Sequence, residues 1–141
     1  MRYENPRFGV SIPVPPGMVA SRPPENGGGQ EFATPDGKVR LLVWASFNVD
    51  GQGDLDVRWA HELADRGQTL TYKRKAKSWF VVSGVTKDGT GFYMRYDANA
   101  KYCSAWEIAY PQAQEPKYVP WVERIAKGCQ PRLGQGEDRV Q

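Results

Sequence analysis

The sequence has 141 residues, which suits a single domain, and its 40% hydrophobic and 25% charged residues are typical of a globular protein. The net charge of +3 is too small to indicate a nucleic-acid-binding protein, because such proteins gather many basic residues on one face. No apolar run approaches the roughly 20 residues that a helix needs to cross a membrane, so we expect no membrane span.

The N-terminal third of the chain predicts three strands. Residues 7–15 alternate apolar and polar side chains, and their prolines favour an edge position. Residues 15–30 are rich in proline and glycine, which is typical of a surface loop. Residues 30–47 predict a hairpin, because Pro35-Asp36-Gly37 supplies the backbone angles that a tight turn needs.

Residues 53–68 predict a helix. Asp54 or Asp56 is expected to cap its first turn, and Gly67 stands where a helix-ending glycine belongs. Apolar side chains four residues apart form one face of this helix, at Leu55, Trp59 and Leu63.

The second half of the chain predicts four strands and a final helix. The strands are expected at residues 69–77, 78–86, 90–98 and 102–110. The helix is expected over residues 119–128, with Pro120 at its first position and Gly128 at its end. The order β-ββ-α-ββββ-α predicts an α+β domain over residues 1–130, in which helices pack on one mostly antiparallel sheet. Residues 131–141 lack periodicity and are predicted to form a flexible tail.

The two cysteines, Cys103 and Cys129, are expected to form a disulfide. Cys103 shares its strand face with small residues, over which a returning helix could bring Cys129 close. A bridge across this loop would stabilise the fold by roughly 3.5 kcal/mol and would indicate an oxidising compartment. The alternative is a pair of buried free thiols, which is common in cytosolic cores.

Four segments, in this order, resemble a group of small secreted or periplasmic bacterial proteins with a PsbP-like (Mog-type) fold. The segments are YENPRFGVSIPVPPGM, NGGGQEFATPDGKVRLLVWAS, SWFVVSG followed by GTGFYMRY, and WEIAYPQAQEPKYVPWVERIAKG. Together they cover about residues 3–130. The resemblance implies an α/β/α sandwich and an exported protein whose signal peptide is absent from this sequence. It supplies no catalytic motif, and it implies a binding or accessory module.

Three other motifs are each better explained by structure than by chemistry. Residues 48–56 resemble a calcium loop, but Trp59 stands where an EF-hand needs glutamate, so helix capping explains the aspartates. His61 is predicted to face solvent beside Asp65, with no nucleophile to activate. Residues 26–30 lack the ending of a phosphate-binding loop. We therefore expect no metal, no cofactor and no enzymatic activity.

The basic stretch at residues 71–79 is the most suggestive polar segment. In a strand, Lys73, Lys75 and Lys77 would share one face. Such a row of lysines can protect an exposed strand edge against aggregation. The alternative is a face that binds an anion or a partner, with Tyr72 and Trp79 nearby as aromatic anchors.

The sequence thus favours a monomeric, non-enzymatic binding or accessory module of the bacterial periplasm or cell envelope, with an unknown ligand or protein partner. An alternative is an immunity- or chaperone-type protein that engages a secreted protein. A hydrolase is a third alternative, which the sequence disfavours because it shows no nucleophile and base pair.

Overall fold

The structure, a computed structural model, describes residues 1–21 and 27–134. Its first half contains β1 (Arg2–Glu4), β2 (Ser11–Pro13), β3 (Val19–Ala20), β4 (Gly29–Ala33), β5 (Arg40–Phe47) and α1 (Leu55–Arg66). The second half contains β6 (Leu70–Lys75), β7 (Trp79–Val85), β8 (Thr90–Ala98), β9 (Tyr102–Pro111) and α2 (Glu115–Gly128), with short 3₁₀ turns at Gly67–Thr69 and Gln112–Gln114.

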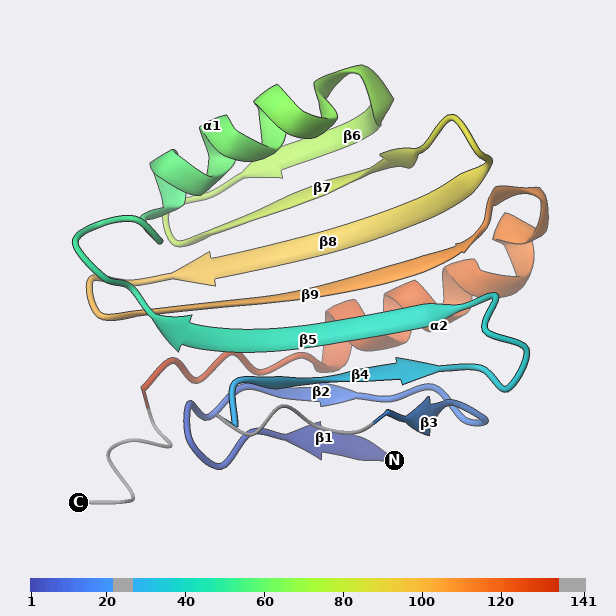
Figure 1. The fold of residues 1–141 in the computed structure, drawn as a ribbon, viewed down its shortest axis with the longest axis horizontal. Helices are drawn as coiled ribbons and strands as arrows, with labels where there is room; N and C mark the ends of the chain where they lie inside the picture. The colour runs from blue at the N-terminus through green and yellow to red at the C-terminus, as the bar shows by residue number, and fades with distance from the viewer. Residues whose placement is uncertain (22–26, 135–141) are drawn as a thin grey trace.

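The predicted α+β class is confirmed. A seven-stranded antiparallel sheet has the order β3-β4-β5-β9-β8-β7-β6, and β1 and β2 form a separate two-stranded ribbon (Figure 1). The predicted hairpin and the four later strands are present, whereas β1 and β3 are short strands that the sequence did not predict. Both consist of three or fewer residues, too few to show a period of two.

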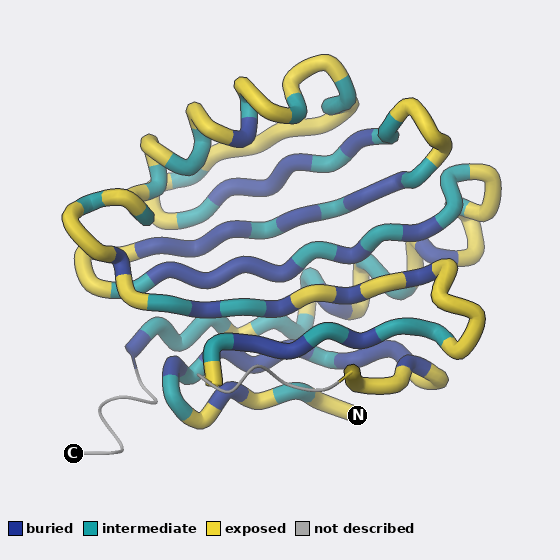
Figure 2. Tube along the Cα trace, in the orientation of Figure 1, coloured by how far each residue is buried: buried dark blue, intermediate teal, exposed yellow. Residues whose placement is uncertain are grey.

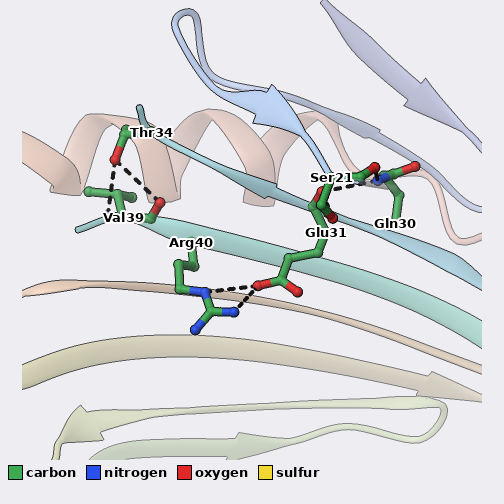
Figure 3. A network of polar contacts seen from close by, with 6 residues as sticks. All are labelled: Ser21, Gln30, Glu31, Thr34, Val39 and Arg40. Atoms are coloured by element: carbon green, nitrogen blue, oxygen red, sulfur yellow. Dashed lines mark hydrogen bonds and ion pairs between the residues drawn. The ribbon is translucent and has the colours of Figure 1, made fainter. Parts of the chain in front are cut away.

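The hairpin of β4 and β5 forms around the predicted turn, where Gly37 has a φ of 71°. Thr34 fixes the turn because its hydroxyl accepts a hydrogen bond from the backbone N–H of Val39 at 3.2 Å (Figure 3). Across the two strands, the guanidinium of Arg40 in β5 pairs with the carboxylate of Glu31 in β4. These local contacts explain why the hairpin could be found from the sequence alone.

The two faces of the sheet carry separate cores. On one face, Leu55 and Trp59 of α1 pack on a cluster of strand residues: Phe80, Val82, Met94, Tyr96, Ala98, Cys103 and Ala105. On the other face, Tyr118 and Ile125 of α2 join the apolar residues of β2, β4, β5 and β9. The domain is therefore an α/β/α sandwich, as the resemblance implied.

Each helix covers only part of its face (Figure 1). Helix α1 contacts β7 and β8, whereas α2 contacts β9 and β2 of the two-stranded ribbon. In Figure 1, α1 is drawn beside β6, near the edge of the sheet. On the α2 side, β6 and β7 extend past the helix. In Figure 2 the central strands are mostly buried, whereas β6 is exposed over nearly all its length.

Helix α2 begins earlier than predicted. It starts at Glu115, with Pro116 in its first turn, so Pro120 lies inside the helix instead of at its first position. Pro120 has no N–H, so the carbonyl four residues earlier receives no helical hydrogen bond. Beyond the helix, the N–H of Gly134 donates to the carbonyl of Phe8 at 3.1 Å. The start of the predicted tail therefore packs on the domain, and residues 135–141 lie outside the described residues.

Candidate functional site

The basic stretch forms β6, the last strand of the sheet. Five of its six residues are exposed. Lys73 and Lys75 lie opposite Val82 and Phe80, whose side chains belong to the core under α1, so the two lysines are on the α1 side. Lys75 pairs with Asp56 of α1. Lys77 lies beyond the end of the strand, in the turn before β7, so it is not part of the predicted row.

Tyr72 and Trp79 lie on the opposite side of the sheet from the two strand lysines. Tyr72 pairs across the strands with Ser83, and Trp79 pairs with Asp97. Because side chains alternate along a strand, both aromatic rings point away from α1. The structure therefore separates the predicted aromatic anchors from Lys73 and Lys75.

Two arginines outside the predicted lysine face lie beside Trp79. The guanidinium carbon of Arg74 is 5.5 Å from the centre of the Trp79 ring, and that of Arg95 is 4.7 Å away. Arg74, Val81 and Arg95 are neighbours across three strands, and Val81 is only 5% exposed. The long arginine side chains thus flank an apolar residue while their charged ends stay near the surface.

Arg95 is held in place by Asp97. Its Nε and one terminal nitrogen donate to the two carboxylate oxygens at 2.8 and 2.9 Å. These hydrogen bonds raise the pKa of Arg95. No described carboxylate pairs in this way with Arg74. The positive charge of Arg95 is therefore balanced by Asp97. The charge of Arg74 has no such carboxylate partner among the described residues and can meet an acidic group of another molecule.

Tyr93 completes this surface. Its ring stacks on Trp106 with centres 5.4 Å apart and planes at 24°. We name the surface formed by Tyr72, Arg74, Trp79, Tyr93 and Arg95 the arginine–aromatic face. The sequence contained a signal for it, because strand alternation places Tyr72 with Arg74 and Tyr93 with Arg95.

The predicted disulfide is wrong. Both cysteines are free thiols. Cys103 lies in the core under α1, whereas Cys129 packs against the core under α2. The sheet separates them, because α2 lies on the face of Trp106 and Ile108 and not on the face of Cys103. The inference of an oxidising compartment consequently loses its structural support.

The side chain of Asn48 holds the calcium-like loop through hydrogen bonds. The side-chain amide of Asn48 donates to the Asp54 carboxylate at 2.7 Å and to the Asn99 carbonyl at 3.0 Å, and its oxygen accepts the N–H of Gly53 at 2.7 Å. Asp54 precedes α1, but its side chain makes no capping hydrogen bond, so the capping prediction is wrong in that detail. Within residues 1–21 and 27–134, no group of three metal-binding side chains forms.

The α1 side carries an ion network beside a small cavity. The buried carboxylate of Glu62 pairs with Arg58 at 2.8 Å and with Arg66 at 3.1 Å, and Arg66 also pairs with Glu107 at 2.7 Å. The cavity, of about 300 Å³, is lined by three charged residues, Asp65, Arg66 and Glu107, together with three threonines, Phe92 and Ala109. His61 is exposed and pairs with Asp65 at 3.0 Å. The polar groups here already have partners within the protein.

None of the described helices combines the length and apolar composition that a bilayer crossing requires. No protein-family model and no curated protein matches the sequence. Solved structures do match. The solution structure of cyanobacterial PsbP from Synechocystis sp. PCC 6803 has a TM-score of 0.68 and 11% identity, covering 92% of this chain and 91% of that one.

A crystal structure of a protein from Bacteroides thetaiotaomicron matches with a TM-score of 0.57 and 14% identity, covering 93% of this chain but 48% of that one. At these identities the likeness concerns the fold alone. The sheet order, the two-sided packing and this likeness agree with the resemblance read from the sequence, and the chain has a PsbP-like fold.

Proposed function

We propose that this protein is a non-enzymatic binding or accessory module of the bacterial periplasm or cell envelope. We further propose that it engages a protein partner through the arginine–aromatic face. The observation that carries the proposal is the position of Trp79, whose ring lies near two guanidinium groups on β7, outside the strands that α2 mainly contacts.

The composition of this face supports protein binding. Tryptophan, tyrosine and arginine are the residues that dominate the binding energy of protein interfaces, because they combine large apolar area with directed polar contacts. Tyr72 is 48% exposed although it is a large aromatic residue. The bidentate contact of Asp97 fixes Arg95 before any partner arrives, so less side-chain entropy is lost on binding.

The assignment to the cell envelope has a different basis. It depends on the resemblance of the sequence to exported bacterial proteins, because the two cysteines are unpaired and do not support it. An immunity- or chaperone-type role would use the same face, since both roles require a surface for another protein.

Site-specific photo-cross-linking in cells that express the protein natively tests the face. A photoreactive phenylalanine analogue replaces Tyr72, and a control places it at Val57, which is 52% exposed on α1. We expect a discrete cross-linked product from position 72 only. We also expect Trp79→Ala, introduced into the position-72 protein, to remove that product. Equal products from both positions would contradict the proposal.

A further inference from the structure

The structure leaves one long strand edge open. Strand β6 is the terminal strand of the sheet and has six residues, five of them exposed. The register of β6 against β7 shifts between Leu70 and Tyr72 and is regular from Tyr72 to Lys75. In that regular part, alternate N–H and C=O groups point away from β7. An unpaired edge of this kind is a template for another strand.

The opposite edge of the sheet differs. Strand β3 there has only two residues. Beside it, the Ser21 hydroxyl donates to the Glu31 carbonyl at 3.0 Å, and the Gln30 side chain donates to the Ser21 carbonyl (Figure 3). Polar groups near β3 are thus already paired within the chain. Among the described strands of the sheet, β6 is therefore the long free edge.

The charged residues at the β6 edge are all basic. Lys73, Arg74, Lys75 and Lys77 lie within five positions. In the described part of the chain, only Lys75 of these four has a carboxylate partner, Asp56. Like charges on neighbouring residues repel, and a second copy of β6 would bring the same charges together. A strand of opposite charge would relieve the repulsion.

We propose that the partner contributes an extended acidic segment, which pairs with β6 as an additional strand of the sheet. This inference rests on the proposed function and specifies its partner. The segment is about 20 Å long if it matches the six residues of β6. Side chains on one of its faces meet Lys73 and Lys75, and those on the other meet Tyr72 and Arg74, next to Trp79.

Three synthetic peptides test this pairing. The first alternates glutamate and valine over seven residues. The second has the same composition with the glutamates grouped at one end, and the third is the first with every backbone amide methylated. We expect the first to bind about fivefold or more tightly than the second, because only alternation places every charge on one face. The methylated peptide should not bind, because it cannot donate to the edge.

Hydrogen exchange of the protein locates the bound peptide. Amides of residues 70–75 should gain protection with the first peptide, because those that faced solvent become paired. Lys73→Glu should weaken binding about fivefold. Lys87→Glu, which makes the same charge change in the turn between β7 and β8, should leave binding nearly unchanged. Circular dichroism melts establish that both variants fold.

The other outcomes overturn the inference. Equal binding of the methylated peptide would mean that acidic segments dock without adding a strand. Equal loss in both charge variants would indicate unspecific attraction. If no peptide binds at low salt, and the double variant Lys73→Ser, Lys75→Ser aggregates faster, the lysines only protect the edge. In each case the cross-link from position 72 still tests the proposed function separately, since it does not require an acidic partner.

Discussion

Cys103 and Cys129 lie on opposite sides of one sheet, the first under α1 and the second beside α2. The Cys103 sulfur is 3.3 Å from the hydroxyl oxygen of Ser46, and the Cys129 sulfur donates to the Ala126 carbonyl at 3.5 Å. The backbone of β9 stands between the two thiols, so no side-chain rotation can join them.

Both thiols should therefore be titratable. We expect a thiol reagent to detect two thiols per chain in denaturant without reductant, because neither sulfur is oxidised. In the folded protein Cys103 should react slowly, since it is 4% exposed. Detection of no thiol in denaturant without reductant would contradict the structure.

Stability should fall at alkaline pH, in part because of Cys129. Burial raises the pKa of its thiol above 9.0, and the nearby Asp97 acts in the same direction, whereas Arg95 opposes it. A raised pKa in the folded state means that this contribution is fully present below the thiol's ordinary pKa. It is lost as pH rises toward the folded value.

The measurement is the free energy of unfolding from urea titrations at pH 7 and above pH 9, for the wild type and Cys129→Ala. The variant should lose less stability between the two conditions than the wild type. An identical pH dependence would show that Cys129 does not contribute. The comparison uses the difference between the two proteins because burial also raises the pKa of four tyrosines, Tyr3, Tyr93, Tyr96 and Tyr110.

Glu62 should be important for stability. Its carboxylate is buried and pairs with Arg58 and Arg66, each about one third exposed. We expect Glu62→Ala to lower the free energy of unfolding by about 1–3 kcal/mol, because hydrogen bonds to a charged group are lost. Asp65→Ala breaks the exposed pair with His61 and should change it by less than about 1 kcal/mol. Thermal and urea unfolding of both variants provide the comparison.

Two glycines should respond oppositely to alanine. A Cβ at Gly29 would lie 2.2 Å from the Val43 carbonyl oxygen, because β4 and β5 approach closely there. Gly29→Ala should destabilise the protein by about 2 kcal/mol or more. Gly67 has φ −51° and ψ −39°, with no atom near a new Cβ. Gly67→Ala should stabilise it by about 0.5–1 kcal/mol, as urea unfolding can show. A stable Gly29→Ala variant would contradict the close approach.

The sequence predicted the parts of the fold that depend on local signals. The hairpin, α1 and the later strands follow from turn residues and periodicity, and the structure confirms them. Gly67 is a partial exception, because it ends α1 in a right-handed conformation and not in the left-handed one usual for a helix-ending glycine.

The side of the sheet that each helix covers could not be predicted locally. Small residues on the Cys103 face correctly indicated a helix, but α1 occupies that face, where Trp59 packs against the cluster that includes Cys103 and Ala105. Helix α2 packs on the bulkier face instead. The choice between the faces depends on how the connections cross the sheet, and residue spacing within one strand does not contain that information.

The same limit applies to the candidate site. Alternation within a strand already implies that Tyr72 and Lys73 lie on opposite faces, so Tyr72 could not anchor the lysine face. The approach of Arg74 and Arg95 to Trp79, in contrast, requires the register of three strands. The prediction for Lys77 failed for a different reason. The end of a strand is hard to locate from sequence, and β6 ends at Lys75, before this lysine.

The inequality of the two sheet edges has a consequence for stoichiometry. A sheet with two receptive edges can join head to tail into a filament, whereas a sheet with one receptive edge accepts a single addition and then stops. Because β6 is long and open while β3 is short, the seven-stranded sheet, as far as the structure describes it, would accept one added strand. A complex formed at β6 would close at one partner per chain, and its mass would not grow with concentration.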